Sequence, residues 1–333
     1  MKILLIGFGS VGRRLSAILA GDPARFPWLS RLNPSVVGIV TRTHGSAADP
    51  EGIDLARVLL PGGFPGQASV PMTAREAVGS LEYDVLVELS TLSIADRGEP
   101  AVSHVRAALT RKRHAVTANK GPAAFAHAEL AGLARSSGVR FLFESAVMDG
   151  APVFAMARAS LKGCTVTGIS GILNSTTNFI LSQMEEGLSP EEALRRAQQE
   201  GFAEADPRLD LEGWDPAVKL SVLSTVLMGI PLPAESIQRE GITRVTCESA
   251  RKAREAGTRL KLVCRAWREG GEARGRVGVE EVSSDNPFAT VRGSSSALRL
   301  ETDLMGPITI MQENPTVTDT AYGVLNDLLT IAG

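Results

Sequence analysis

The sequence is poor in the residue types that mark specialised proteins. Its 333 residues include only three cysteines, four histidines and 5% aromatic residues. The cysteines (Cys164, Cys247 and Cys264) are far apart and lack the paired spacing of a metal cluster, so we expect reduced thiols. The chain lacks an apolar run of about 18 residues, and its first apolar segment is too short for a signal peptide. These absences predict a cytoplasmic protein that does not enter a membrane.

Neither sign of charge dominates the chain. Lys and Arg number 35 against 37 Asp and Glu, and the formal net charge of −2 offers no basic surface for a nucleic acid. The hydrophobic fraction of 44% and the charged fraction of 22% are typical of a globular protein. Because the chain exceeds the size of most single cores, we expect two domains. Without a basic surface for a nucleic acid, we expect a small-molecule substrate as the binding partner.

The first part of the chain alternates short apolar runs with helical patterns. Strands are predicted at 3–6, 36–40, 85–89, 115–117 and 141–143, and helices at 11–19, 101–110 and 123–134. This alternation favours an α/β fold with a doubly wound parallel sheet of the Rossmann type, which we assign to a dinucleotide-binding domain at 1–143. The Gly- and Pro-rich stretch 45–80 is expected to be irregular.

The remainder has a different character and predicts an α+β domain at 144–304. A helix is expected from Val153, strands at 166–173, 276–282 and 298–302, and a polar turn at 174–178. A helix at 190–200 is indicated by Ser189 as its cap, and another runs from Asp215 as cap through Met228. The C-terminal segment at about 305–333, apolar and helical over 319–331, is expected to pack back on the first domain.

A glycine-rich segment, GFGSVG at 7–12, directly follows the first predicted strand and opens a helix. In this context Gly7 permits the tight turn, Gly9 lets the backbone approach a pyrophosphate, and Gly12 lets the helix pack on the strand. The helix N-terminus then offers N–H donors to the anion, with Ser10 and Val11 at its start. The segment predicts a dinucleotide site, and a glycine turn without a ligand is the alternative.

The choice of dinucleotide depends on the residues that follow the second strand. An acidic residue there would bind the ribose 2′-hydroxyl of NAD, but Val40 is followed by Thr41, Arg42, Thr43 and His44. A guanidinium at Arg42 suits a 2′-phosphate, so NADP is favoured and NAD remains the alternative. Arg42 facing solvent without a ligand is the other interpretation.

The predicted helix 216–228 is apolar nearly all round, and Lys219 is its only charge. Asp215 lies four residues earlier on the same helix face, so an ordinary ion pair is one explanation. Five acidic residues crowd the preceding Gly/Pro-rich loop, however, and carboxylates converging near a buried lysine could hold a substrate ammonium group. These residues are Glu204, Asp206, Asp210, Glu212 and Asp215.

Segments spread over most of the chain resemble the homoserine dehydrogenase family. The longest is GFAEADPRLDLEGWDPAVK at 201–219, joined by ELST at 88–91, TANKG at 117–121, FESAVMDGAP at 143–152 and GILNSTTN at 171–178. The resemblance implies reversible NAD(P)H-dependent reduction of L-aspartate 4-semialdehyde to L-homoserine in threonine and methionine biosynthesis. It also implies a cytoplasmic homodimer and, because the chain stops at Gly333, a short form without a C-terminal regulatory domain.

The resemblance also implies roles for individual residues. Lys219 and Lys120 take the positions of the family's two active-site lysines, and the substrate is expected at Thr176, Glu204, Asp210 and Asp215. Ser90, Thr91 and Lys120 join the glycine segment at the cofactor. Glu144 and Val147 match a segment that binds a monovalent cation, Na⁺ or K⁺, mostly through backbone carbonyls; a structural turn is the equal alternative there. A lysine ammonium can protonate the oxygen that a hydride transfer leaves negative.

The sequence departs from the family pattern at three places. Residues 311–321 (MQENPTVTDTA) replace a glycine-rich stretch before the final helix, Ser175 replaces a glycine in the substrate turn, and Phe202 stands where tyrosine is common. These departures leave two alternatives open. One is a dehydrogenase of a related amino-acid semialdehyde or oxo acid, and the other is a catalytically silent NAD(P)-binding sensor.

Overall fold

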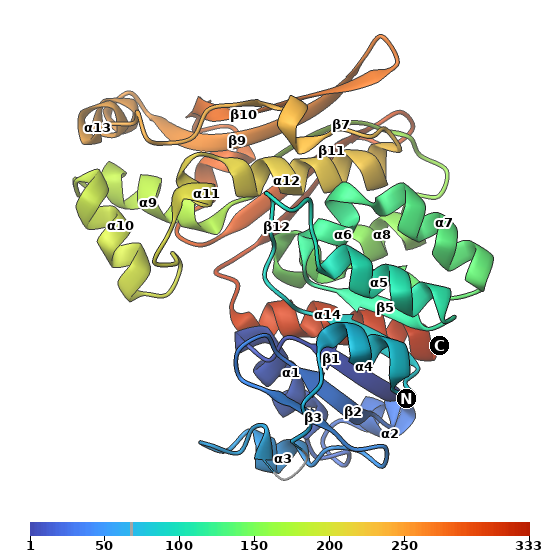
Figure 1. The fold of residues 1–333 in the computed structure, drawn as a ribbon. Coiled ribbons are helices and arrows are strands. Elements are labelled where there is room, and N and C mark those ends of the chain that lie inside the picture. The colour runs from blue at the N-terminus through green and yellow to red at the C-terminus, as the bar shows by residue number, and fades with distance from the viewer. Residues whose placement is uncertain (67–68) are drawn as a thin grey trace. The chain divides into compact units, whose positions relative to one another are not determined.

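A computed structural model describes residues 1–66 and 69–333. The chain forms two compact units, Met1–Pro152 together with Thr316–Gly333, and Val153–Pro315 (Figure 1). Of the described residues, none belongs to a helix that has both the length and the apolar character needed to span a membrane.

The first unit contains a six-stranded sheet in the order β3-β2-β1-β4-β5-β6. All neighbouring pairs are parallel except β2 with β3. The strands are β1 (Lys2–Ile6), β2 (Ser35–Val40), β3 (Ser46–Ala48), β4 (Val85–Glu88), β5 (His114–Thr117) and β6 (Phe141–Leu142). The strand order reverses direction between β1 and β4, the position at which open α/β sheets bind ligands. The predicted doubly wound parallel sheet is confirmed.

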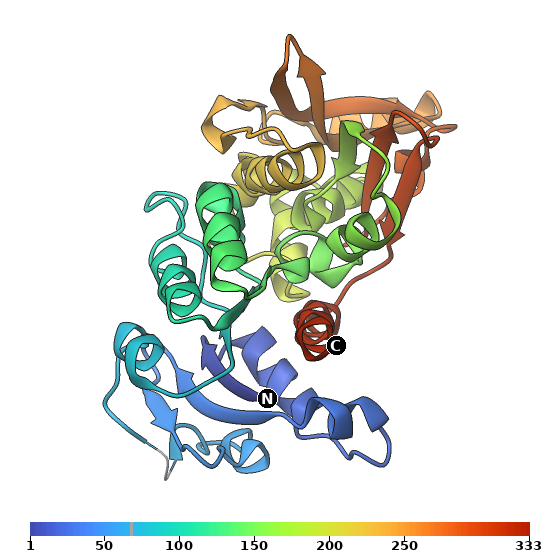
Figure 2. The same cartoon turned by 90° about the vertical axis from the view of Figure 1, so that its right-hand side faces the viewer.

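Helices and short turns complete the first unit. They are α1 (Ser10–Leu19), α2 (Pro27–Leu32), α3 (Leu55–Val58), α4 (Ala74–Ser80), α5 (Ala101–Thr110), α6 (Lys120–Phe125), α7 (His127–Ser137), η2 (Glu144–Ala146), η3 (Met148–Gly150) and α14 (Val317–Ala332). Helix α14 packs beside α1, where Arg14 Nε donates to Thr318 Oγ1 at 2.8 Å (Figures 1 and 2).

Two local expectations for this unit are wrong. The stretch 45–80 is not simply irregular, since β3, α3 and α4 lie in it; α3 and α4 are too short to show a helical period, although a capping box of Thr73 and Glu76 marks α4. The helix expected at 123–134 is two helices separated at Ala126, whose φ of −138° is not helical. The C-terminal helix, Val317–Ala332, confirms the helix expected at 319–331.

The second unit contains a six-stranded sheet in the order β12-β11-β7-β9-β10-β8. Its neighbouring strands are antiparallel except β8 with β10. The strands are β7 (Val166–Ile172), β8 (Gln238–Arg239), β9 (Thr258–Glu269), β10 (Glu272–Ser283), β11 (Ser296–Thr302) and β12 (Ile308–Gln312). Strands β8, β9 and β12 are not among the strands predicted from the sequence. Strand β9 carries cations such as Arg259, Lys261 and Arg265 that interrupt its apolar pattern, although the Gly270-Gly271 turn joining it to β10 is a hairpin signal.

The helices of this unit are α8 (Val153–Ser160), α9 (Ser175–Glu185), α10 (Pro190–Gln199), α11 (Arg208–Leu211), α12 (Trp214–Leu223), η4 (Ser224–Met228), η5 (Ala234–Ser236), α13 (Cys247–Glu255) and η6 (Pro287–Thr290). Helices α9, α12 and α13 pack against β9. The Ser189 capping box that begins α10 is confirmed.

Two helix starts in this unit differ from the expectation. Helix α12 begins at Trp214 after a left-handed Gly213, so Asp215 lies in its first turn and is not its cap; the helix continues to Met228 as a π-helical turn. The expected polar turn at 174–178 is the cap and first turn of α9, because the Asn174 side chain accepts from Thr177 N. Both polar clusters therefore lie at helix N-termini.

Candidate functional site

The glycine segment lies between β1 and α1 in the geometry that a pyrophosphate requires. Gly7 has a φ of +100°, and a Cβ there would lie 2.7 Å from the Leu89 carbonyl carbon and oxygen. A Cβ on Gly12 would lie 2.6 Å from Gly7 O, whereas a Cβ on Gly9 would meet nothing within 4 Å. Gly7 and Gly12 are thus required for packing, and Gly9 faces open space in front of the N-terminus of α1, where Ser10 and Val11 begin the helix.

The ends of β4 and β5 are joined by Asn119, a buried asparagine that is not among the predicted site residues. Asn119 Nδ2 donates to Ser90 O at 2.9 Å, and its Oδ1 accepts from Gly121 N at 2.8 Å, which caps α6. Lys120 is the first residue of this helix, half-buried at the carboxyl end of the parallel sheet, and not a loop residue. Asn119 therefore positions both Ser90 and Lys120; Thr91, one residue further, is exposed. The signal in the sequence was an asparagine directly before the lysine.

Arg42 follows β2 beside the glycine segment. Strand β2 ends at Val40, whose carbonyl accepts from Gly7 N at 2.8 Å, and the turn after it is closed by Thr41 Oγ1 donating to Gly45 O at 2.8 Å. The Arg42 side chain is exposed. The start of this turn therefore lies next to the glycine segment, where a guanidinium is available to a ligand.

Glu144 and Val147 lie in a buried turn packed on α14. Both residues are fully buried, and Glu144 N donates to Asp327 Oδ2 at 2.8 Å. The next residues, Met148, Asp149 and Gly150, all have positive φ. Within residues 1–66 and 69–333 there is no cluster of three or more His, Cys, Asp or Glu side chains that could hold a metal ion. A cation here would have to be bound mainly by backbone oxygens.

In the second unit, the end of β7 gathers a lysine and two carboxylates. Lys219 Nζ lies 2.9 Å from Asp215 Oδ2 and donates to Leu173 O at 2.7 Å. Asn174 Nδ2 donates to Asp215 Oδ2 at 2.9 Å and to Asp210 Oδ1 at 2.6 Å. The ordinary i,i+4 pair is therefore present, but it is part of a larger network. We call Asn174, Asp210, Asp215 and Lys219 the carboxylate cluster.

Burial and the nearby charge of Asp215 raise the pKa of Asp210. Hydrogen bonding from Asn174 and the charge of Lys219 oppose this shift. Two partly buried carboxylates with one lysine leave a net negative site, which suits a ligand ammonium group. The cluster thus has the electrostatics expected for the amino end of an amino acid.

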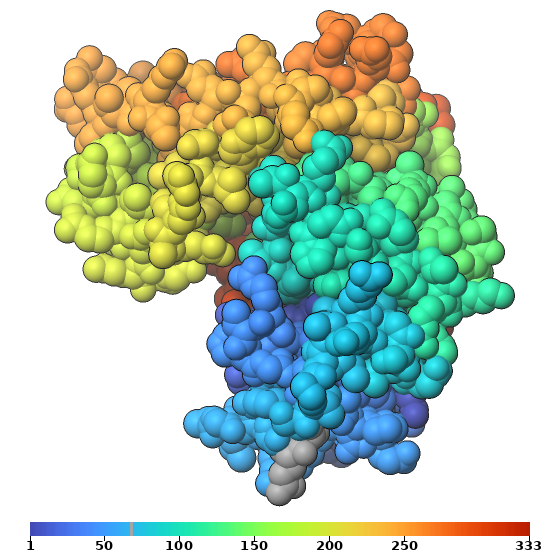
Figure 3. Space-filling model, in the orientation of Figure 1, coloured from blue at the N-terminus to red at the C-terminus, as the bar shows by residue number. Residues whose placement is uncertain are grey.

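The remaining expected substrate residues lie at different places. Thr176 is buried in the first turn of α9 and donates to Phe202 O at 2.7 Å. Glu204 is exposed, and its backbone oxygen accepts from Gln198 Nε2 at 3.2 Å. The segment around residues 200–212 is drawn in yellow in Figure 3. Asp206 is exposed and bound by Arg208, whose hydrogen bonds lower the pKa of Asp206 to about 2. Of the five acidic residues, the hydrogen bonds therefore bring Asp210 and Asp215 together.

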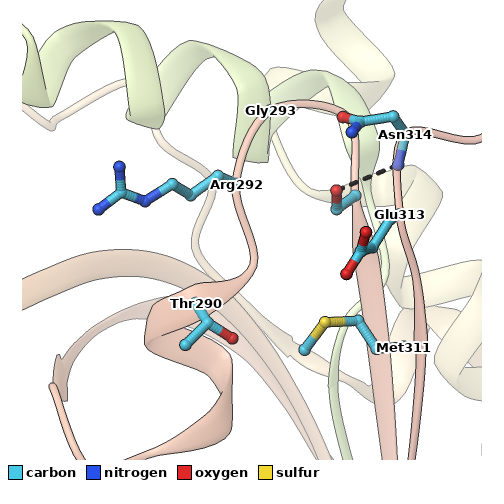
Figure 4. Close-up of a pocket in the computed structure, with 7 residues that line it drawn as sticks. Thr290, Arg292, Gly293, Met311, Glu313 and Asn314 are labelled. Carbon is cyan, nitrogen blue, oxygen red and sulfur yellow. Dashed lines mark hydrogen bonds between the residues drawn. The ribbon is translucent and has the colours of Figure 1, made fainter.

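A pocket of about 360 Å³ lies elsewhere in the second unit (Figure 4). Asn314 N donates to Ser295 Oγ at 3.1 Å, which ties the end of β12 to the loop before β11. The Arg292 side chain extends away from Glu313. The pocket contains none of the predicted site residues but includes part of the divergent stretch 311–321; its lining residues are Thr290, Arg292, Gly293, Ser295, Met311, Glu313 and Asn314.

Lys261, a buried lysine that is not among the predicted site residues, holds the loop that lines this pocket. Lys261 is fully buried on β9 and donates to Val291 O at 2.6 Å and to Asn178 Oδ1 at 3.1 Å. Asn178 Nδ2 in turn donates to Gly293 O at 2.9 Å. Burial lowers the pKa of Lys261 to about 8. These hydrogen bonds satisfy the polar groups of Lys261 and Asn178 and so allow both side chains to be buried in the second unit.

Comparison with known proteins gives a consistent result. A homoserine dehydrogenase family model matches residues 152–329. The NAD(+)-dependent homoserine dehydrogenase of Pseudomonas canavaninivorans is 34% identical over 99% of this chain and 96% of its own length. A homoserine dehydrogenase structure from Thiobacillus denitrificans has a TM-score of 0.82 and 30% identity, and covers 100% of this chain and 73% of its own.

A further structure, of a hyperthermophilic archaeal homoserine dehydrogenase in complex with NADPH, has a TM-score of 0.83 at 27% identity, over 99% of this chain and 97% of its own. The sequence and structure comparisons extend over nearly the full length of the chain, the family model covers residues 152–329, and all of them name the same family. The chain belongs to the homoserine dehydrogenase family of NAD(P)-dependent oxidoreductases.

Proposed function

We propose that this protein is a homoserine dehydrogenase, which interconverts L-aspartate 4-semialdehyde and L-homoserine in threonine and methionine biosynthesis. The observation that carries the proposal is the carboxylate cluster at the end of β7, with Lys219 paired to Asp215 at 2.9 Å and two carboxylates joined by one amide. Such a cluster can hold an amino acid by its ammonium group while a lysine faces its side chain. Family membership supports the same reaction.

The proposed mechanism divides the work between binding and proton transfer. Asp210 and Asp215 bind the substrate ammonium group, and Thr176 contributes its hydroxyl at the start of α9. The nicotinamide, when bound, supplies or accepts the hydride at the carbon that bears the oxygen. During reduction Lys219 or Lys120 donates a proton to the oxygen, and in the reverse direction a neutral lysine accepts the hydroxyl proton. Glu204, whose side chain is exposed, is kept as a proposed substrate residue on the family resemblance alone.

The proposed cofactor is NADP, bound by Gly7, Gly9, Ser10, Val11 and Gly12. The open space at Gly9 and the uncapped N-terminus of α1 fit a pyrophosphate. The exposed Arg42 fits a 2′-phosphate, and Ser90, Thr91 and Lys120 line the carboxyl ends of β4 and β5. The relatives include both an NAD(+)-dependent enzyme and an NADPH complex, so NAD is the competing assignment.

Steady-state kinetics with L-homoserine and either NAD or NADP tests both proposals. We expect turnover with a lower KM for NADP, and we expect Arg42→Ala to raise the KM for NADP while leaving that for NAD unchanged. Wild-type protein that binds NADP but does not oxidise homoserine at high enzyme concentration would overturn the proposed activity. A lower KM for NAD in the wild type would overturn only the cofactor assignment.

We also propose a monovalent cation, Na⁺ or K⁺, at the turn that contains Glu144 and Val147. Its support is the full burial of the Glu144 carboxylate and the run of left-handed residues after it, together with the family resemblance. A cation there would hold the turn against α14 and take no part in proton transfer. Activity and melting temperature in Na⁺, K⁺ and tetramethylammonium buffers test it, and equal values in all three would refute it.

A homodimer is proposed through the part of the second sheet that exposes Trp267 and Met311. Trp267 is 39% exposed opposite Gly168, and Met311 is 38% exposed opposite Ala297, which pairs with Ile172. Since Gly168 and Ile172 are an even number of residues apart on β7, Trp267 and Met311 lie on the same face. Light scattering should give twice the mass of 35.2 kDa, and Trp267→Arg should give the single mass. The free cysteines support a cytoplasmic location.

A further inference from the structure

The Asn174 side chain uses its complete hydrogen-bonding capacity inside the carboxylate cluster. Nδ2 donates to Asp210 Oδ1 and Asp215 Oδ2, at 2.6 and 2.9 Å, while Oδ1 accepts from Thr177 N and Thr177 Oγ1, both at 2.8 Å. An amide has two N–H donors and two acceptor lone pairs, so none remains unused. The opposite orientation would place Oδ1 against two carboxylates, which makes the assignment of the amide unambiguous.

We propose that Asn174 is a positioning residue for the substrate: its amide holds Asp210 and Asp215 side by side so that they form one ammonium-binding subsite. This inference rests on the proposed function, which assigns substrate binding to these carboxylates. Without the amide that both carboxylates share, the repulsion between two like charges would favour their separation. The amide donors oppose that repulsion, and they do so without adding a positive charge that would compete with the substrate.

Asn174 connects the two helices that carry the carboxylates to the second sheet. Asp210 lies on α11, a helix of four residues followed by the left-handed Gly213, and Asp215 lies in the first turn of α12. Asn174 follows β7, which is paired on both edges with β11 and β9. The bonds from Asn174 therefore fasten two carboxylates, 36 and 41 residues away in sequence, to the centre of the sheet.

The same strand end also positions the proposed proton donor. Lys219 Nζ donates to the carbonyl of Leu173, the residue directly before Asn174, and shares Asp215 Oδ2 with the Asn174 amide. Two successive residues thus set the lysine and the carboxylates relative to one another. Replacing Asn174 removes the amide but keeps the Leu173 carbonyl, which holds Lys219. We therefore expect the KM for the substrate to change more than kcat.

Asn174→Ser and Asn174→Asp separate this role from helix capping. Serine and aspartate both cap helix N-termini well, so each keeps an acceptor for Thr177 N, but neither can donate to both carboxylates. We expect the KM for homoserine to rise about 10- to 100-fold, the effect of a lost hydrogen bond to a charged group. The KM for the cofactor should stay close to wild type. Asn174→Ser should still fold because the helix cap is kept, with a lower melting temperature because two carboxylates lose a donor, and Asn174→Asp, with a third carboxylate, should be worse in both affinity and stability.

Asn286→Ser is the matched control, because Asn286 caps η6 in the same unit through Phe288 N and has no place in the cluster. Its KM for homoserine should equal that of wild type. An unchanged homoserine KM in Asn174→Ser, or equal losses in kcat and in cofactor KM, would overturn the inference.

The melting temperature in the presence of homoserine is measured in parallel. If wild type is inactive but homoserine stabilises it and not Asn174→Ser, the dehydrogenase assignment fails while the positioning role stands. If homoserine stabilises neither protein and wild type is inactive, both are overturned.

Discussion

Replacing Lys219 with alanine removes the cation from the carboxylate cluster and tests both its structural and its chemical role. Lys219 and Asp215 lie 2.9 Å apart, with side chains only 13% and 15% exposed. Breaking a buried pair costs about 3–5 kcal/mol, whereas an exposed pair contributes about 0–1 kcal/mol. Because this pair retains some solvent, and Leu173 O also loses its donor, we expect the free energy of unfolding to fall by about 2–3 kcal/mol at pH 7.

A second lysine provides the control at the same helical spacing. Lys252 pairs with Glu248 at 2.6 Å, but their side chains are 66% and 67% exposed. Lys252→Ala should therefore lower the free energy of unfolding by no more than about 0.5 kcal/mol. Urea denaturation of the two variants measures the difference, and equal losses would refute the argument from burial.

Activity supplies the second readout for Lys219→Ala. A positioned acid or base typically contributes about 10²–10⁴-fold to rate, so kcat with homoserine should fall by that factor, while Lys252→Ala should keep wild-type activity. The assay is performed at a temperature at which both variants are folded. Comparable turnover by Lys219→Ala and wild type would show that Lys219 is not catalytic, and Lys120 would then be the remaining candidate.

Three further predictions follow from packing and burial. Gly7→Ala places a Cβ 2.7 Å from the Leu89 carbonyl at a positive φ, so it should cost more than about 1 kcal/mol in stability and abolish dinucleotide binding, measured by denaturation and calorimetry. Asp210→Asn should gain stability relative to wild type at pH 7 but not at pH 3. Burial raises the pKa of the Asp210 carboxyl in the folded protein, so the folded protein binds this proton more tightly than the unfolded chain does. The stability that results is present below the ordinary pKa of aspartate and is lost as the pH rises through the raised pKa. An asparagine at this position stays neutral at both pH values. Burial raises the pKa of Cys264 to about 12, so native protein at pH 8 should resist iodoacetamide at this cysteine, as measured by mass spectrometry.

Each of these predictions has an internal control. Gly79→Ala in α4 adds a Cβ with nothing within 4 Å and should leave stability unchanged or higher, so a similar loss at both glycines contradicts the steric argument. For Asp210→Asn, a stability difference that is the same at pH 3 and pH 7 would be incompatible with a raised pKa. Cys164 and Cys247 are half-buried and should react before Cys264; simultaneous labelling of all three would contradict the burial argument.

Much of the first unit could be predicted because its signals are local. Strands β1 (KILLI) and β4 (VLVE) are apolar except for one charged residue at an end, and the glycine segment between β1 and α1 needs only neighbouring residues to define its turn. In the second unit, the capping box at Ser189 likewise depends only on residues within one helical turn. Strand β9 was missed because its cations interrupt the apolar pattern, and only its neighbours in the sheet reveal that Lys261 is buried.

The sequence by itself determined the parallel sheet, the glycine turn and the presence of a lysine and acidic residues near 204–219. Only the tertiary structure decided which of those acids act together. Hydrogen bonds from Asn174 bring Asp210 and Asp215 together, while Glu204 is exposed. These bonds join residues 36 and 41 positions apart, and no hydrophobic periodicity or short motif predicts them. The physical reason is the distance along the sequence over which each interaction acts. Backbone propensity and helix capping depend on residues a few positions apart, whereas a buried polar network forms only when strand and helix ends that are distant in the sequence meet.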